Sequence, residues 1–156
     1  MTLLHTQAPN FTLNNEQGQP VQLSDFLGKN VVLYFYPKDM TPGCTTEACD
    51  FRDAYADFSK LNAVILGISA DDAKKHTKFI EKYNLPFSLL VDSDHSVAEA
   101  YGVWVLKKMY GREFMGIERS TFLINEKGVI AKEWRKVRVK NHIEDVLTYL
   151  QDGGEE

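Results

Sequence analysis

The sequence lacks the features of a membrane, secreted or nucleic-acid-binding protein. No apolar run approaches the roughly 18 to 20 residues that a membrane-spanning helix needs, and the N-terminus has no basic stretch followed by an apolar one. Basic residues do not exceed acidic ones. With 18 against 22, the formal net charge is -4 at pH 7, which argues against nucleic acid or an anionic membrane as the main partner. We therefore expect a soluble cytoplasmic protein.

Cysteine is also scarce, with two residues, Cys44 and Cys49, in a chain of 156. Two cysteines cannot form the disulfide framework of a small secreted domain. Hydrophobic residues make up 44% of the chain, which is enough to build a core without such a framework. The four histidines stand singly, and the chain has no C-x2-C or H-x3-H spacing of the kind that zinc sites use. We expect no metal and no cofactor, and a reactive or redox role for the cysteines.

The order of apolar runs and turn signals predicts the fold class. No internal repeat, low-complexity segment or linker is present, so we predict one domain over 1–151 and a frayed tail at 152–156. The predicted strands are 31–37, 63–70, 87–93, 119–125 and 129–137, and the predicted helices are 71–84, 92–102 and about 140–151. Strands that alternate with helices, followed by a hairpin and a last helix, predict an α/β fold with a mixed central sheet flanked by helices.

The segment that carries both cysteines has the pattern of a helix. Apolar residues from Cys44 to Phe58 recur at i, i+4, i+7, i+11 and i+14, which is one stripe of a helix. Thr41 is a natural N-cap and Pro42 fits the first helical position, so Cys44 lies in the first turn. The unpaired N–H groups and the positive dipole end there favour the thiolate, the form of cysteine that attacks.

Cys49 lies five residues after Cys44, about 140° around the helix on its polar side, and we expect it to be exposed. At this spacing an intact helix holds the two Cα atoms about 8.6 Å apart, whereas a disulfide usually needs roughly 6.8 Å or less. A bond between the two thiols would therefore require the first turns, around 42–50, to unwind. The residues alone leave two interpretations open, a redox pair or two ordinary cysteines, one buried and one incidental.

The same segment, YPKDMTPGCTTEACDFRD, resembles the active-site segment of the peroxiredoxins, in particular the bacterioferritin-comigratory-protein branch, also called PrxQ. The family pattern of Pro, three residues, Thr, two residues and Cys corresponds to Pro37, Thr41 and Cys44. Cys49 corresponds to the resolving cysteine of this branch, and Arg119, in the segment MYGREFMGIERSTFLINEKGVI, corresponds to its active-site arginine. The resemblance covers nearly the whole chain and departs from the family in the loop GVWVLKKM.

This resemblance implies a thioredoxin-like fold with an N-terminal extension, and a thiol-dependent peroxidase that reduces hydrogen peroxide and organic hydroperoxides. Cys44 would attack the peroxide and become a sulfenic acid, and Cys49 would resolve it as an intramolecular disulfide that thioredoxin or a similar dithiol reduces. Thr41 and Arg119 would bind the peroxide oxygens. We also expect Pro37, Pro42, Gly43, Glu47 and Trp104 to line the pocket. We expect a monomer.

Several of these residues would also fit a purely structural role. Arg119 could be a surface arginine of a strand, Thr41 is accounted for by a helix cap alone, and Glu47 could pair with Arg119 or favour the helix start by its charge. Two other functions stay open. One is a redox sensor or holdase-type interaction protein, and the other is a thioredoxin-like thiol-disulfide oxidoreductase, which would use Cys-x2-Cys rather than the Cys-x4-Cys of this chain.

Overall fold

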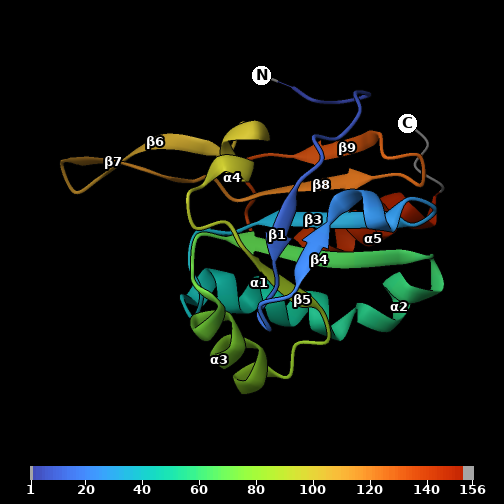
Figure 1. Cartoon of the computed structure of the whole chain (residues 1–156), viewed down its shortest axis with the longest axis horizontal. Coiled ribbons are helices and arrows are strands. Elements are labelled where there is room, and N and C mark those ends of the chain that lie inside the picture. Colours follow the sequence, from blue (N-terminus) through green and yellow to red (C-terminus); the bar gives the residue numbers. More distant parts are fainter. Residues whose placement is uncertain (1, 153–156) are drawn as a thin grey trace.

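The computed structural model describes residues 2–152 and, within them, contains a seven-stranded mixed sheet with helices on both faces (Figure 1). The strands are β1 (Thr12–Asn14), β2 (Pro20–Gln22), β3 (Asn30–Phe35), β4 (Ala63–Ser69), β5 (Ser88–Val91), β6 (Trp104–Met109), β7 (Arg112–Ile117), β8 (Ser120–Ile124) and β9 (Ile130–Trp134). The helices are η1 (Leu23–Phe26), α1 (Pro42–Asp53), α2 (Tyr55–Lys60), α3 (Ala73–Tyr83), α4 (Ser96–Ala100) and α5 (His142–Gln151). The predicted α/β class with a mixed central sheet is confirmed.

The sheet has the order β2-β1-β5-β4-β3-β8-β9. Its three central strands, β3, β4 and β5, are parallel to one another, which fits their near-continuous apolar sequences. The predicted hairpin forms β8 and β9, and β8 pairs antiparallel with β3. The N-terminal segment adds β1 and β2 at the opposite edge. Because β3 is central, the chain that leaves its carboxyl end emerges in the middle of one edge of the sheet.

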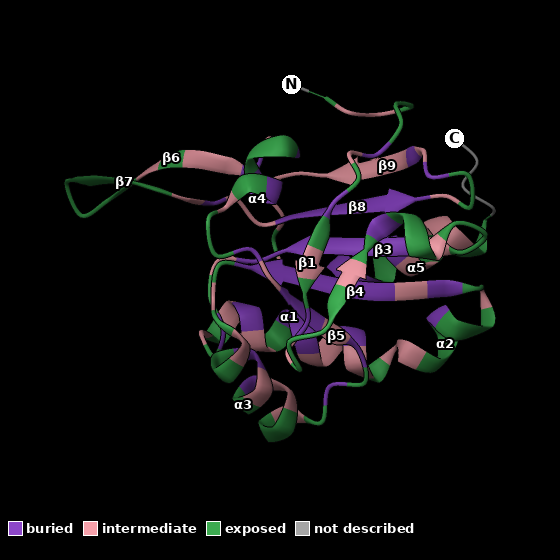
Figure 2. Ribbon diagram, viewed as in Figure 1, coloured by how far each residue is buried: buried purple, intermediate pink, exposed green. Residues whose placement is uncertain are grey.

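β3 is buried along most of its length (Figure 2), and its side chains, which alternate between the two faces of the sheet, divide the core into two clusters. Val31, Leu33 and Phe35 pack on one face with residues of η1, α4 and the N-terminal segment. On the other face, Val32 and Tyr34 pack with residues of α1, α2, α3 and α5. The cysteine-bearing helix therefore lies on the face that carries most of the helices.

The structure corrects two local predictions. The single helical stripe from Cys44 to Phe58 is wrong, because α1 ends at Asp53 and α2 begins at Tyr55. Ala54 between them has φ -96° and ψ 3°, and the bend still leaves Phe58 fully buried. The prediction of a loop at 102–109 is also wrong, because most of this segment forms β6. This strand pairs antiparallel with β7 in a separate two-stranded sheet.

The turn between β6 and β7 explains why this hairpin was missed. Its two central residues, Tyr110 and Gly111, both have positive φ, 54° and 77°. Two-residue hairpin turns of this kind are normally signalled by Asn-Gly or Asp-Gly, and here a tyrosine takes the first position. Within residues 2–152, no helix is long and apolar enough to cross a membrane. Apart from Asp152, the predicted tail at 152–156 lies outside the described residues.

Candidate active site

Cys44 lies in the first turn of α1, shortly after the chain leaves β3. It is 1% exposed and belongs to the core cluster that contains Ala48 and Phe51. Pro42 begins the helix, where its fixed φ is suitable and its missing N–H is not needed. The N–H groups of a first turn have no partner inside their helix, so they and the helix dipole offer positive potential to the sulfur.

Arg119, between β7 and β8, reaches the sulfur of Cys44 from the sheet. Its Nη2 donates to Cys44 Sγ at 3.3 Å, and its Nη1 donates to Glu47 Oε1 at 2.6 Å. The side chain is largely buried. Burial alone lowers the pKa of Arg119, but Glu47 and Cys44 together outweigh it and raise that pKa. The guanidinium therefore keeps its charge beside the sulfur and links two residues of α1 to the sheet.

Glu47 is fully buried on the same face of α1, three residues after Cys44. One carboxylate oxygen accepts from Arg119, whereas Oε2 has no hydrogen-bond partner in the described structure. Burial raises the pKa of Glu47 from 4.5 to about 7, against the opposing effect of Arg119. Of the two roles left open by the sequence, the ion pair with Arg119 is therefore present.

Tyr34 of β3 lies below these groups and was not anticipated. Its hydroxyl is buried and, in the described structure, has no hydrogen-bond partner. Burial raises the pKa of Tyr34, and the charges of Glu47 and Cys44 raise it further. The tyrosine therefore stays a neutral donor close to two groups that carry or develop negative charge. No sequence signal points to it, because a tyrosine inside an apolar strand has the pattern of an ordinary core residue.

Thr41 occupies the N-cap position of α1 with an extended backbone, but its side chain does not cap the helix. Its hydroxyl donates to the carbonyl of Lys38 at 2.9 Å. The predicted side-chain cap is therefore wrong. Because the Thr41 hydroxyl already donates its proton to the Lys38 carbonyl, its oxygen is left with lone pairs that can accept a hydrogen bond from a bound ligand.

Gly43 follows Pro42 in the first turn and sits directly under the guanidinium. A Cβ atom at this position would stand 3.1 Å from Arg119 Nη2. That distance is shorter than an ordinary van der Waals contact, so a side chain here would displace the group that bonds Cys44. Pro37 and Pro42 precede Cys44 on the segment between β3 and α1, half-buried and exposed respectively.

Comparisons with known proteins show the family of this chain. Residues 4–133 match the AhpC/TSA family. The chain belongs to this family. It is 60% identical to the Peroxiredoxin Bcp of Bacillus subtilis over 149 residues, which cover 96% of this chain and 95% of that protein. It is 43% identical to the Peroxiredoxin Bcp of Escherichia coli K12, with 93% of each chain covered.

Solved structures place the chain in the same branch. A structure of the bacterioferritin comigratory protein of Xanthomonas campestris, described with its alkyl peroxide reduction activity, matches with a TM-score of 0.88. The two sequences are 41% identical, and the match covers 93% of this chain and 92% of the Xanthomonas chain. A mutant PrxQ of Xylella fastidiosa matches with a TM-score of 0.90 and 40% identity over 99% of this chain and 96% of its own. The predicted thioredoxin-like fold and the resemblance to the peroxiredoxins are thereby confirmed.

Cys49 of this peroxiredoxin lies in the continuous part of α1, and neither cysteine is in a disulfide. It is half-buried, so the expectation of an exposed thiol is only partly correct. Since α1 is helical from Pro42 to Asp53, the spacing argument applies to it without change, and a bond to Cys44 requires the helix to open. Among residues 2–152, no cluster of three or more His, Cys, Asp or Glu side chains could hold a metal ion.

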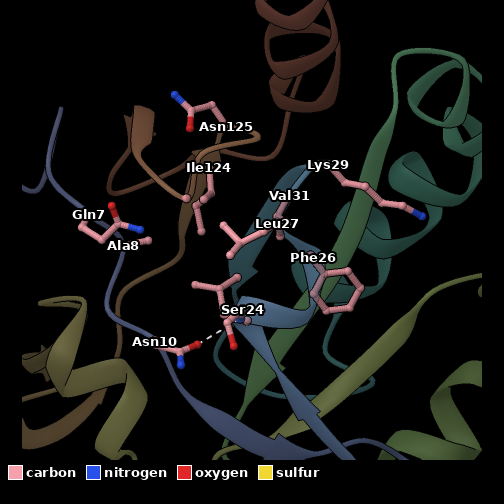
Figure 3. A pocket seen from close by; sticks show the side chains of 12 residues that line it. Gln7, Ala8, Asn10, Ser24, Phe26, Leu27, Lys29, Val31, Ile124 and Asn125 are labelled. Carbon is pink, nitrogen blue, oxygen red and sulfur yellow. Dashed lines mark hydrogen bonds between the residues drawn. The ribbon is translucent and has the colours of Figure 1, made fainter.

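Trp104 is not brought to Cys44 by any described contact. It is half-buried at the start of β6, where its ring stacks on His95 with a centroid distance of 3.9 Å. It packs against the core cluster on the face of the sheet opposite Cys44. A pocket of about 260 Å³ also lies on that opposite face, between the N-terminal segment, η1 and the turn after β8 (Figure 3). The mostly apolar hollow is therefore separate from the site around Cys44.

Proposed function

We propose that Cys44 is the thiolate with which this peroxiredoxin reduces hydrogen peroxide and organic hydroperoxides. The observation that carries the proposal is the 3.3 Å hydrogen bond from Arg119 Nη2 to Cys44 Sγ. A permanently charged guanidinium at this distance favours the sulfur anion over the neutral thiol. The start of α1 acts in the same direction, because its N–H groups and dipole also favour negative charge.

In the first step the Cys44 thiolate attacks the terminal oxygen of ROOH. A sulfur–oxygen bond forms, the oxygen–oxygen bond breaks, and the sulfur is oxidised to a sulfenic acid while the peroxide is reduced. The departing RO⁻ takes a proton from solvent and leaves as ROH. Arg119 and the first-turn N–H groups of α1 stabilise the negative charge as it moves to RO⁻. Thr41 Oγ1 accepts a hydrogen bond from the peroxide hydroxyl, because its own proton is donated to the Lys38 carbonyl, and that peroxide proton stays on the oxygen that becomes the sulfenic acid. Two opposite polar partners thus orient the peroxide.

The remaining pocket residues position these groups. Glu47 holds Arg119 through the 2.6 Å ion pair, and Gly43 leaves the space that the guanidinium occupies. Pro37 and Pro42 shape the segment that brings Thr41 to Cys44. Trp104 is expected from the sequence to line the pocket, but its stacking on His95 favours a structural role instead.

In the second step Cys49 attacks the sulfenic sulfur, water leaves, and an intramolecular disulfide forms. A thioredoxin-type dithiol then reduces that disulfide by thiol–disulfide exchange. This step requires the first turns of α1, around 42–50, to unwind. The two free thiols must be regenerated in every cycle, which fits a reducing compartment such as the cytoplasm. The proposal includes a monomeric protein, as the sequence predicts.

The test is peroxide consumption by the full chain with thioredoxin, its reductase and NADPH. Wild type is expected to turn over, and Cys44→Ser is expected to be inactive with any reductant. Cys49→Ser is expected to lose thioredoxin-linked turnover and to keep reaction with peroxide when dithiothreitol is the reductant, because a small thiol can reach the sulfenic acid directly.

Each result can contradict one part of the proposal. Activity in Cys44→Ser would move the nucleophile elsewhere, and full thioredoxin-linked turnover in Cys49→Ser would remove its resolving role. A redox sensor or holdase would be favoured if wild type reacted with peroxide once but showed no turnover with either reductant.

A further inference from the structure

The hairpin β6–β7 carries most of the strongly exposed large apolar side chains of the described residues. It projects from the body of the protein and pairs with no other strand of the described residues (Figures 1 and 2). Of the seven large apolar residues that are strongly exposed within residues 2–152, five lie on it. They are Leu106, Met109, Tyr110, Phe114 and Met115. Clusters of this kind on a soluble surface usually mark an interaction site.

The strand register sorts these side chains onto two faces, because residues that pair across an antiparallel ladder point to the same side. Lys107 pairs with Phe114, and Leu106 pairs with Met115. The face that includes Lys107 is called here the cysteine-side face, and it consists of Val105, Lys107, Met109, Arg112, Phe114 and Gly116. The other is called the outer face, and it consists of Trp104, Leu106, Lys108, Glu113, Met115 and Ile117.

The packing of the hairpin base shows which face is directed toward the active site: Ile117 is buried in the cluster opposite Cys44, so the residues that alternate with it point to the Cys44 side. Lys107 agrees with this direction. Its aliphatic chain lies across Gly116, where a Cβ would stand 3.3 Å from Lys107 Cδ. Burial and the positive charge of Arg119 lower the pKa of Lys107, while negative charge at Cys44 raises it. Both site residues therefore act on this ammonium group. The strand β7 also leads within two residues to Arg119, so the hairpin base and the site are continuous.

The outer face is directed elsewhere. At its base, Trp104 stacks on His95, and Ile117 is buried in the core cluster on the opposite side of the sheet from Cys44. Farther out, Lys108 and Glu113 form an ion pair across the ladder at 3.5 Å. The two faces thus carry similar exposed apolar side chains, but only the cysteine-side face adjoins the site.

Charge points to the nature of a partner. The hairpin holds three basic residues and one acidic residue, on a chain whose net charge is -4. Two copies that met through the same face would bring Lys107 and Arg112 against their own equivalents, because a twofold contact is self-complementary. A partner with acidic groups around an apolar area would meet opposite charge instead, which speeds encounter.

We propose that the cysteine-side face of β6–β7 is the docking surface for the protein dithiol that reduces the Cys44–Cys49 disulfide. This proposal rests on the proposed function, since only a disulfide cycle requires such a partner. The reductant must bring a thiolate within bonding distance of one of the two sulfurs, and the hairpin base leads within two residues to Arg119, which donates to Cys44 Sγ at 3.3 Å. Met109 and Phe114 supply the apolar contact, Arg112 and Lys107 attract an acidic rim, and the interface is a small, transient one.

Two double variants of the full chain test the proposal, and the second is the matched control for the first. Met109→Ser with Phe114→Ser removes the apolar side chains of the cysteine-side face, and Leu106→Ser with Met115→Ser removes those of the outer face. The exposures of the two pairs are similar, 53% and 44% against 56% and 48%. Peroxide turnover is measured with increasing thioredoxin and, separately, with dithiothreitol, which needs no docking surface.

We expect the cysteine-side variant to raise the KM for thioredoxin about tenfold, as truncation of central interface contacts does, with dithiothreitol-driven turnover unchanged. The outer-face variant is expected to match wild type in both assays. An unchanged KM in both variants, or an equal rise in both, would overturn the proposal. Reduced dithiothreitol turnover in the cysteine-side variant would also overturn it, because the face would then serve peroxide binding or folding. A wild-type dimer that dissociates in this variant would overturn it as well, because the face would then be a contact between two copies of the chain. A wild type that turned over peroxide with neither thioredoxin nor dithiothreitol would instead disprove the peroxidase function itself.

Discussion

Replacing Glu47 by glutamine should stabilise the protein above neutral pH and slow its reaction with peroxide. Glu47 is fully buried, and one of its carboxylate oxygens has no hydrogen-bond partner in the described structure. Burial raises its pKa from 4.5 to about 7, even with Arg119 beside it. Glutamine keeps the shape and the acceptor oxygen for Arg119 and removes the charge that burial disfavours.

The magnitude follows from proton linkage. Because the pKa of the folded state lies above that of the unfolded state, the folded protein holds the extra proton between about pH 4.5 and 7, and stability falls as pH rises through this window. At about 1.4 kcal/mol for each pH unit, wild type loses about 3 kcal/mol by about pH 8. The glutamine variant has no such loss. Its free energy of unfolding should therefore equal that of wild type near pH 4 and exceed it by about 3 kcal/mol near pH 8.

Urea unfolding of both proteins across this range measures the difference. His142, whose pKa burial lowers from 6.5 to about 4, contributes stability that is lost as pH falls through that window, but both proteins carry it and the subtraction removes it. Peroxide turnover of the variant should fall about tenfold, since a neutral acceptor holds Arg119 less firmly than a carboxylate by about 1 kcal/mol or more. A stability difference that does not change with pH would refute the argument, because Glu47 would then not titrate in this window.

Two further predictions concern Gly43 and the buried His76. Gly43→Ala should leave stability unchanged or raise it by up to about 1 kcal/mol, because alanine favours helix, yet it should lower the rate of peroxide reduction by displacing Arg119; equal stopped-flow rates for variant and wild type would contradict it. His76→Leu should lower the free energy of unfolding by about 1 to 3 kcal/mol in urea titrations, because it leaves the buried side chain of Asp39 without its 2.6 Å hydrogen-bond partner; an unchanged free energy of unfolding would contradict this prediction.

The central strands could be predicted from the sequence because burial on both faces leaves a near-continuous apolar run. The hairpin β6–β7 could not, because its strands carry exposed apolar residues and its turn begins with Tyr110 in place of Asn or Asp. The single helix predicted from Cys44 to Phe58 failed for a different reason. The apolar spacing continues through the bend at Ala54, so periodicity alone does not reveal it.

The candidate site divides in the same way. The position of Cys44 in a first helical turn follows from local signals, the Thr-Pro pair and the apolar stripe. The approach of Arg119 depends on β8 pairing with β3, a contact between segments far apart in the chain, so local patterns could not indicate it. Resemblance to the peroxiredoxins supplied that residue. The hydroxyl of Thr41 shows the limit of local rules, because Lys38 takes the proton that a side-chain cap would leave free.

The first turns of α1 must meet two opposing demands, and their sequence balances them. Attack on peroxide needs Cys44 held against Arg119, whereas disulfide formation needs the same turns to open. Gly43 lowers helix stability by about 1 kcal/mol relative to alanine, and Thr41 withholds a side-chain cap that is worth about as much. Farther along, Phe51 is fixed between the rings of Tyr34 and Phe87, at 4.7 and 6.3 Å. The start of the helix therefore has weak local helix signals, whereas Phe51 is fixed in the core, so the opening can be confined to the segment between the two cysteines and its immediate surroundings.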